Sequence, residues 1–220
     1  MYEKIAEELL NRLAKAITEY DADSASDLTI DLLSRGIDPK RIINDGLSKG
    51  IQEVSDKFNR LEVFLPHMIF AADAMQIAVH KIIESLPPDR KHEVILGKVV
   101  LGTVKGDIHD VGKNIFKTML LATGFEVYDL GVDVPTEYFI NRAEEIKADI
   151  IALSCLMTTC LIQLKEVIED LVRLKIRNKY KVLVGGGAVT ETFAHKVAAD
   201  GYSLDAIAGA GLAKKILGKE

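Results

Sequence analysis

The stretch KVVLGTVKGDIHDVG, residues 98–112, decides the fold of this chain. Its first seven residues form an apolar run rich in β-branched side chains, which is typical of a buried strand. A loop bounded by Gly106 and Gly112 follows, and His109 lies in it between two aspartates. A helical pattern then begins at Val111. A buried strand that passes through a short loop into a helix predicts the first unit of a parallel α/β sheet.

The same strand–helix alternation continues through the rest of the chain. Strand-like runs are expected at 97–104, 125–130, 148–156, 181–187 and 204–209, with helices at 111–122, 136–147, 158–177, 191–199 and 212–217. This pattern predicts a five-stranded parallel sheet with helices on both faces. By analogy, the strand order is flavodoxin-like, 2-1-3-4-5, with the ligand crevice outside the carboxyl ends of strands 1 and 3. Three loops then meet at one edge of the sheet: 106–112, 154–159 and 185–187.

Residues 1–88 show a different pattern, with four amphipathic helices and no strand. The helices are expected at about 2–20, 23–36, 38–59 and 65–86. Asp38 is a good N-cap before Pro39, and Gly36 is a candidate left-handed cap at the end of the second helix. Four such helices with short connections predict a small four-helix bundle.

Pro87 and Pro88 separate the two regions. Prolines end helices and stiffen short connections, so residues 87–93 are expected to link a helical domain at 1–88 to an α/β domain at 93–220. We expect a hinge between two rigid bodies at Leu86–Glu93.

Composition limits the classes of function. The 220 residues are 48% hydrophobic and 28% charged, which is typical of a globular protein. Residues 1–90 carry 16 acidic and 11 basic side chains and residues 91–220 carry 17 of each, so neither part has the basic excess of a nucleic-acid binder. No window approaches roughly 18 uncharged apolar residues, and the acidic start is unlike a secretory signal, so no membrane segment is expected. Cys155 and Cys160 predict reduced thiols and a cytoplasmic location.

The loop at 106–112 has three possible explanations: a phosphate-binding loop, a surface turn or a metal site. The chain has no G-x-x-x-x-G-K-[ST] run and no G-x-G-x-x-G at the first βα turn, which argues against phosphate binding. A lone loop histidine is usually a surface residue, and this alternative stays open. Asp107 could, however, accept the Nδ1 proton of His109 and leave Nε2 free to bind a metal. No other histidine or cysteine has a ligand spacing with His109, so such a metal would arrive with its other ligands, as in a macrocycle.

Three sequence elements resemble those of cobalamin-binding domains. DIHDVG at 107–112 matches the family's D-x-H-x-x-G element, SCL at 154–156 its S-x-L element, and GG at 185–186 its G-G element. They occur in the family's order and at its separations. EVFLPHMIFAADAM at 62–75 resembles the helical cap segment of corrinoid proteins. Nearly the whole chain is therefore similar to the corrinoid proteins of methanol-, methylamine- or betaine-type methyltransferase systems, which are related to the cobalamin-binding part of methionine synthase.

The resemblance implies a role for each matching residue. His109 would be the lower axial ligand of cobalt in a base-off, His-on cobalamin, and Asp107 would orient its ring. Gly106 and Gly112 would let the loop bend beneath the corrin, and the displaced nucleotide tail would enter the sheet domain. The other residues expected at the cofactor are Ile108, Asp110, Ser154, Leu156, Thr158, Gly185, Gly186, Ala210 and, from the helical cap, Phe64 over the upper cobalt face.

One position departs from the family pattern. Methionine synthase has a serine at the position of Cys160, where it extends the Asp–His relay. A thiol is a poor hydrogen-bond partner, so the part of Cys160 in this relay stays open.

The resemblance also implies a function and partners. The chain would carry a methyl group on cobalt, as methylcobalamin, between two enzymes. One is a substrate-specific methyltransferase, and the other passes the methyl group to a thiol or to tetrahydrofolate. A reductive activation protein would be a further partner. The methyl donor, the acceptor and the stoichiometry of assembly are not encoded in this chain, because the substrate pocket lies on the partner.

Two other classes share the cobalamin-binding elements. The small subunit of an adenosylcobalamin-dependent mutase has them, but the segment at 62–75 argues against it. A cobalamin-sensing module would need a DNA-binding segment, and no helix-turn-helix or basic region precedes the bundle. Outside cobalamin binding, a flavodoxin-like response module could use the same fold, because a fold does not decide a function.

Overall fold

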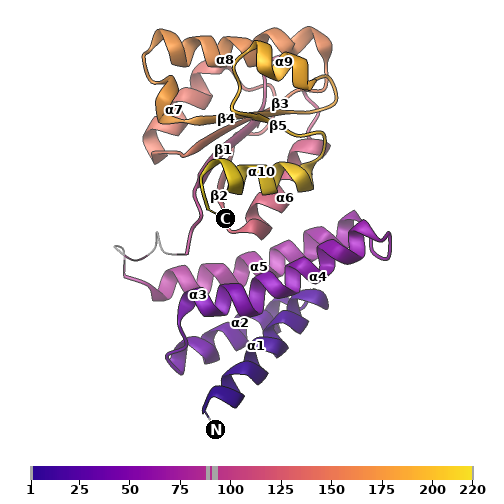
Figure 1. Cartoon of the computed structure of the whole chain (residues 1–220), viewed down its shortest axis with the longest axis vertical. Coiled ribbons are helices and arrows are strands. Elements are labelled where there is room, and N and C mark those ends of the chain that lie inside the picture. Colours follow the sequence, from indigo (N-terminus) through magenta and orange to yellow (C-terminus); the bar gives the residue numbers. More distant parts are fainter. Residues whose placement is uncertain (1, 88–89, 91–93, 220) are drawn as a thin grey trace. The chain divides into compact units, whose positions relative to one another are not determined.

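The computed structural model describes residues 2–87, 90 and 94–219. The chain forms two compact units, Met1–Ile95 and Leu96–Glu220 (Figure 1). The linker expected at 87–93 and the hinge expected at Leu86–Glu93 fall largely outside the described residues. The predicted domain bounds therefore stay predictions.

The first unit is a bundle of four helices. They are α1 (Tyr2–Thr18), α2 (Ala22–Ser34), α5 (Leu65–Ser85) and a third helix composed of α3 (Pro39–Arg41), the π-helical η1 (Ile42–Leu47) and α4 (Ser48–Asn59). Helix α2 packs on α1 and α5, and α4 packs on the same two helices. The largest fully buried side chains between them are Leu13, Ile17, Leu32, Ile42, Leu47, Met68, Met75 and Ile82. The structure confirms the predicted four-helix bundle.

Side-chain caps set the helix boundaries in this unit. Asp21 accepts a hydrogen bond from Ser24 N at 2.9 Å, so α2 begins at Ala22 rather than at the predicted residue 23 or 24. Asp38 accepts from Lys40 N at 2.8 Å, and Gly36 has a φ of +73°. Both caps confirm the prediction.

Two glycines let the third helix pass close over α1. A Cβ on Gly50 would lie 2.6 Å from Ala14 O, and one on Gly46 would lie 2.8 Å from Leu13 Cδ2. Any larger residue would push the helices apart. The longest helix of the unit, α5, has 21 residues. Neither it nor another described helix combines the length and the apolar character that crossing a bilayer requires.

The second unit is built on a parallel sheet of β1 (Lys98–Thr103), β2 (Glu126–Asp129), β3 (Ile150–Ser154), β4 (Lys181–Gly185) and β5 (Gly201–Tyr202). The strand order is β2-β1-β3-β4-β5, as predicted. The pairing register places Thr103 opposite Ser154, and Ser154 opposite Gly185. The three central strands therefore end level with one another, and the loops that follow them start from one edge.

Helices cover both faces of this sheet. They are α6 (Val111–Thr123), α7 (Thr136–Ile146), η3 (Thr158–Cys160), α8 (Leu161–Arg173), η4 (Arg177–Lys179), α9 (Glu191–Lys196) and α10 (Ala206–Ile216). Figure 1 shows α7 and α8 on one face of the sheet and α6 and α10 on the other. Because both faces are covered, β1, β3 and β4 are almost continuously apolar and buried.

The fifth strand predicted at 204–209 is wrong. The strand is the two-residue β5, and LDAIAG instead leads into α10. Asp205 is the N-cap of that helix and accepts a hydrogen bond from Ala208 N at 2.8 Å. A short apolar run fits either a strand or a buried helix, and the aspartate was the signal for the helix.

Candidate functional site

The three loops predicted to meet at the carboxyl edge of the sheet are joined by hydrogen bonds. Asp107 Oδ2, after β1, accepts from Leu156 N at 2.6 Å and Met157 N at 3.1 Å, after β3. Cys155 N donates to Gly185 O at 2.9 Å, which joins the loop after β3 to the end of β4. The candidate site is therefore one connected surface made from segments that are far apart in the sequence.

Asp107 and His109 form the centre of this surface. Asp107 is fully buried, and its Oδ1 accepts from His109 N at 3.0 Å and lies 2.7 Å from His109 Nδ1. The His109 side chain is 49% exposed. Its Nε2 makes no hydrogen bond to a described residue. One ring nitrogen is thus held by the protein while the other is accessible, as the sequence predicted.

The charge on Asp107 fixes the tautomer of His109. Burial by itself would raise the pKa of Asp107, but hydrogen bonds from His109, Leu156 and Met157 outweigh burial and lower the pKa to about 2. At neutral pH the carboxylate is charged and can only accept, so His109 Nδ1 donates its proton to it. The lone pair of the neutral ring is then on Nε2, which is the form that binds a metal.

Two further residues, Thr103 and Asp133, hold the backbone of the loop. Buried Thr103 donates from Oγ1 to His109 O at 2.9 Å. Asp133 Oδ1 accepts from Gly106 N at 2.7 Å, and Asp133 N donates to Asp107 O at 2.9 Å. Sequence reasoning missed both residues. A threonine in an otherwise apolar strand was a signal for the first, whereas nothing in the local sequence pointed to Asp133.

Apolar side chains are exposed on the two loops that carry these groups. They are Ile108, Val111, Leu156 and Met157, between 40% and 72% exposed. Asp110 and Gly112 are exposed as well. A group of exposed apolar side chains next to a polar centre is typical of a ligand-binding surface. Ile108 and Leu156, two of the predicted cofactor contacts, are thus exposed on this surface.

The glycines of the site differ in what they do. Gly106 has a φ of +82° and Gly186 a φ of +104°, and a Cβ on Gly186 would lie 2.3 Å from Cys155 O. Both positions need glycine. The bend predicted at Gly112 is wrong, because Gly112 lies in the first turn of α6 and its φ is not positive. A Cβ there would meet nothing within 4 Å, so Gly112 leaves the surface beside the loop open.

The polar residues after β3 are only partly engaged. Ser154 is half-buried, and its hydroxyl makes no hydrogen bond to a described residue, so it does not cap the helix that follows. Thr158 is exposed at the start of η3. Both hydroxyls are free to contact a ligand.

Cys160 does not extend the Asp–His pair. It is buried, and its Sγ lies 3.8 Å from Thr159 Oγ1 rather than against Asp107. The thiol that responds to Asp107 is Cys155, where burial first and then the charge of Asp107 raise the pKa to about 12. Four N–H groups of His109, Leu156 and Met157 surround the carboxylate, and the Cys155 side chain also contacts it.

Two predicted cofactor residues are not part of the three loops at the edge of the sheet. Phe64 is the N-cap residue of α5 in the helical unit, 65% exposed, and its N–H donates to His67 Nδ1 at 3.1 Å. Ala210 lies in α10 and is 3% exposed, so its side chain is not open to a ligand in this structure. Their contacts with a cofactor stay predictions.

The donor set fits a metal that is already chelated. Among the described residues there is no group of three or more His, Cys, Asp or Glu side chains that could hold a metal ion. His109 is thus a single candidate ligand surrounded by apolar side chains. This arrangement suits the flat face of a macrocycle better than a bare ion.

Comparisons with known proteins identify the family to which this chain belongs. Residues 97–211 match a family described as a B12 binding domain, and residues 9–82 match a second family with the same description. The chain is 44% identical over 212 residues to a dimethylamine corrinoid protein of Methanosarcina barkeri, covering 96% of this chain and 98% of that one. It is 40% identical over 196 residues to trimethylamine corrinoid protein 1 of Methanosarcina mazei, covering 89% and 91%.

A solved structure agrees with the sequence comparisons. The methanol:cobalamin methyltransferase complex MtaBC of Methanosarcina barkeri contains a chain that matches with a TM-score of 0.82 and 32% identity, covering 97% of this chain and 81% of that one. The fold, the two matched domains and the relatives therefore agree over nearly the whole length. This chain belongs to the B12-binding corrinoid proteins of methyltransferase systems.

Proposed function

We propose that this protein binds a corrinoid in the base-off, His-on form, with His109 as the lower axial ligand, and carries a methyl group between two methyltransferases. One observation supports this most directly: His109 Nδ1 lies 2.7 Å from a buried carboxylate while half of the side chain stays exposed. The bound corrinoid would supply the cobalt ion that accepts and releases the methyl group. The protein would supply ligation, orientation and shielding.

Each residue of the surface has a task in this proposal. Asp107 orients the imidazole and keeps its proton on Nδ1. The exposed side chains of Ile108 and Leu156 contact the ring system. The space left at Gly112 lets the ring approach the loop. The nucleotide tail passes Ser154 and Thr158 on one side and Gly185 and Gly186 on the other, with Ala210 at the far end of its path. Asp110 is a further residue at the cofactor.

The names of the relatives support a set of partners. Two relatives are corrinoid proteins named for trimethylamine and dimethylamine, and one similar solved structure is a methanol:cobalamin methyltransferase complex. We propose a substrate-specific methyltransferase as donor, a second methyltransferase with a thiol or tetrahydrofolate acceptor, and a reductive activation protein. Both cysteines are free thiols, in keeping with a cytoplasmic location.

A shielded methyl group requires movement between the two units. Phe64 and the start of α5 would cover the upper cobalt face, and the chain would bend at Leu86–Glu93. Limited proteolysis with and without cobalamin measures this. We expect cofactor-dependent cleavage near the linker, and an identical pattern in both states would contradict the movement.

The binding and the transfer are tested separately. The purified protein is reconstituted with aquacobalamin, and the absorption and EPR spectra of the cobalt(II) form are recorded. We expect nitrogen splitting from one axial imidazole of the protein. Methyl transfer is then assayed with cognate partners and a panel of methylamines, methanol and glycine betaine. Failure to bind cobalamin would overturn the proposal, and binding without transfer from any donor would overturn its methyl-carrying part.

A further inference from the structure

A buried ion pair lies behind the loop that carries His109. The Lys113 side chain is 2% exposed, and its Nζ lies 2.7 Å from both carboxylate oxygens of Asp129 at the end of β2. A lysine in the first turn of a helix also opposes the helix dipole. Neither residue of this pair has a task in the proposed function.

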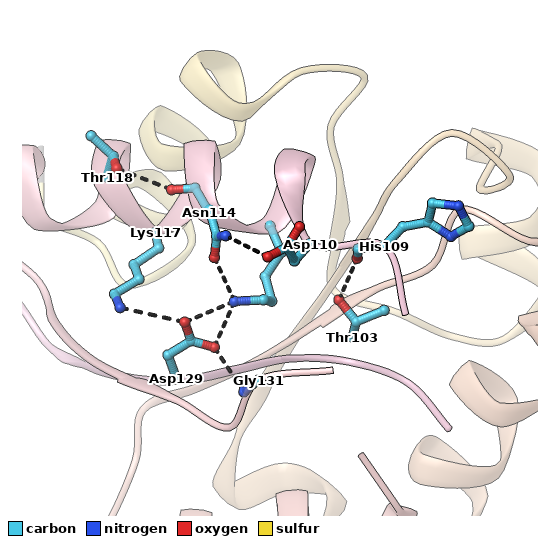
Figure 2. Close-up of polar contacts among 9 residues, drawn as sticks. Thr103, His109, Asp110, Asn114, Lys117, Thr118, Asp129 and Gly131 are labelled. Carbon is cyan, nitrogen blue, oxygen red and sulfur yellow. Dashed lines mark hydrogen bonds and ion pairs between the residues drawn. The ribbon is translucent and has the colours of Figure 1, made fainter. Parts of the chain in front are cut away.

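Hydrogen bonds connect this pair to the residue after His109. Lys113 Nζ donates to Asn114 Oδ1 at 2.7 Å, and Asn114 Nδ2 donates to Asp110 Oδ2 at 3.0 Å. Asn114 N also donates to Asp110 O at 2.7 Å. Figure 2 shows Asp129, Asn114 and Asp110 in this chain of contacts. Asp129 on β2 therefore helps to fix the position of Asp110 through Lys113 and Asn114.

A second connection reaches His109 itself. Asp129 Oδ1 accepts from Gly131 N at 3.0 Å, and Gly131 O accepts from Thr103 N at 3.0 Å. Thr103 Oγ1 then donates to His109 O at 2.9 Å. In Figure 2 the His109 ring points away from this network. The contacts therefore hold the backbone at His109 and Asp110 and do not involve the imidazole ring.

Burying two charges costs free energy, which indicates that the pair serves to fix the position of its neighbours rather than to stabilise the fold. A buried ion pair contributes less to stability than well-packed apolar side chains of similar volume. It does fix position, because both partners need several hydrogen bonds in one geometry. Lys117 also lies 3.4 Å from Asp129, but its side chain is 38% exposed and it makes no contact with the loop among the described residues.

We infer that Thr103 and the Lys113–Asp129 pair, connected through Asn114, are positioning residues that hold His109 in the geometry of a lower axial ligand. This inference rests on the proposed function. It adds a second support to the one supplied by Asp107: the carboxylate aims the ring, and the network fixes the peptide from which the ring projects.

The test uses the full chain reconstituted with aquacobalamin and reduced to cobalt(II). The protein is labelled with ¹⁵N-histidine, so that the splitting from its imidazole differs from that of the ¹⁴N base of the cofactor. The ratio of His-on to His-off cobalt is read from this protein-derived splitting in the EPR spectrum, and the melting temperature of the cofactor-free protein is measured beside it. The variants are Thr103→Val, with Thr103→Ser as the conservative rescue, and Asn114→Ala, whose side chain is exposed and whose loss leaves the core intact. Lys113→Met/Asp129→Leu removes the pair without an unpaired charge, and Lys117→Met is the matched control.

We expect Thr103→Val, Asn114→Ala and the double variant to lower the His-on to His-off ratio about 10-fold, the lower end of the range for partners behind a metal ligand. Thr103→Ser and Lys117→Met should keep the parental ratio. The inference is overturned if the first three variants keep the parental ratio, even with lowered melting temperatures. If the parent itself shows no splitting, or keeps it after His109→Gly, the proposed function has failed instead.

Discussion

Two carboxylate–base pairs lie close to the same loop and differ in exposure. Asp107 and His109 are 2.7 Å apart, and the base is 49% exposed. Asp129 and Lys113 are also 2.7 Å apart, and the base is 2% exposed. In both pairs burial of the carboxylate would raise its pKa, and hydrogen bonds outweigh burial and lower it.

The difference in exposure separates two tasks. The buried lysine has used its donors on Asp129 and Asn114, so this pair can only fix structure. His109 donates one ring proton and keeps the second nitrogen accessible, so this pair can still bind something. Although the two pairs have similar distances and charges, the Lys113–Asp129 pair can only position its neighbours, whereas the Asp107–His109 pair can bind a ligand.

The largest effect is expected from removing the accessible base. In His109→Gly reconstituted with cobalamin, the protein nitrogen splitting should disappear completely, because no other imidazole is held in the loop. Added imidazole should restore it by filling the space of the lost ring. Unchanged splitting without imidazole would contradict the assignment of His109 as ligand.

Breaking one side of the buried pair should also lower the stability of the cofactor-free protein. Lys113→Met leaves Asp129 charged and poorly paired, and the free energy of unfolding should fall by about 3–5 kcal/mol. Urea denaturation of the cofactor-free protein measures this. Lys113→Met/Asp129→Leu should recover most of the loss, and an equal loss in both variants would show that packing, not the unpaired charge, is the cause.

The Asp107–His109 pair should make the free energy of unfolding depend on pH in the acid range. The pKa of Asp107 falls from an ordinary 3.8 to about 2 on folding, so the unfolded chain takes up the proton first as pH falls. The stabilisation, about 2 kcal/mol, is then fully present above pH 5 and lost as pH drops from about 4 to 2. Urea midpoints of the cofactor-free parent and Asp107→Asn should converge over that interval. A constant gap between them would contradict the lowered pKa.

The smallest effect is expected from replacing Lys117, the second lysine that lies close to Asp129. Lys117→Met should change the free energy of unfolding by less than about 0.5 kcal/mol, because the side chain is partly exposed and Lys113 still pairs with the carboxylate. Urea denaturation again measures it. A loss as large as that of Lys113→Met would show that burial does not separate the two lysines.

Local signals were sufficient for most of the fold and for the centre of the site. Apolar periodicity predicted the helices and four of the five strands, and the DIHDVG element identified Asp107 and His109. The prediction failed where the signal was ambiguous. LDAIAG fits a strand or a helix, and β5 instead forms at Gly201, where a Cβ would lie 2.7 Å from Leu183 Cδ2 on the neighbouring strand.

The sequence by itself determined most of the element types, the parallel sheet and the identity of the candidate ligand, because each depends on residues close together in the chain. Only the tertiary structure decided what surrounds that ligand. Asp107 meets the amides of Leu156 and Met157, and Lys113 meets Asp129, because the strand register brings the loops after β1, β2 and β3 to one edge. Hydrogen-bond partners brought together by strand pairing leave no periodic trace in the sequence.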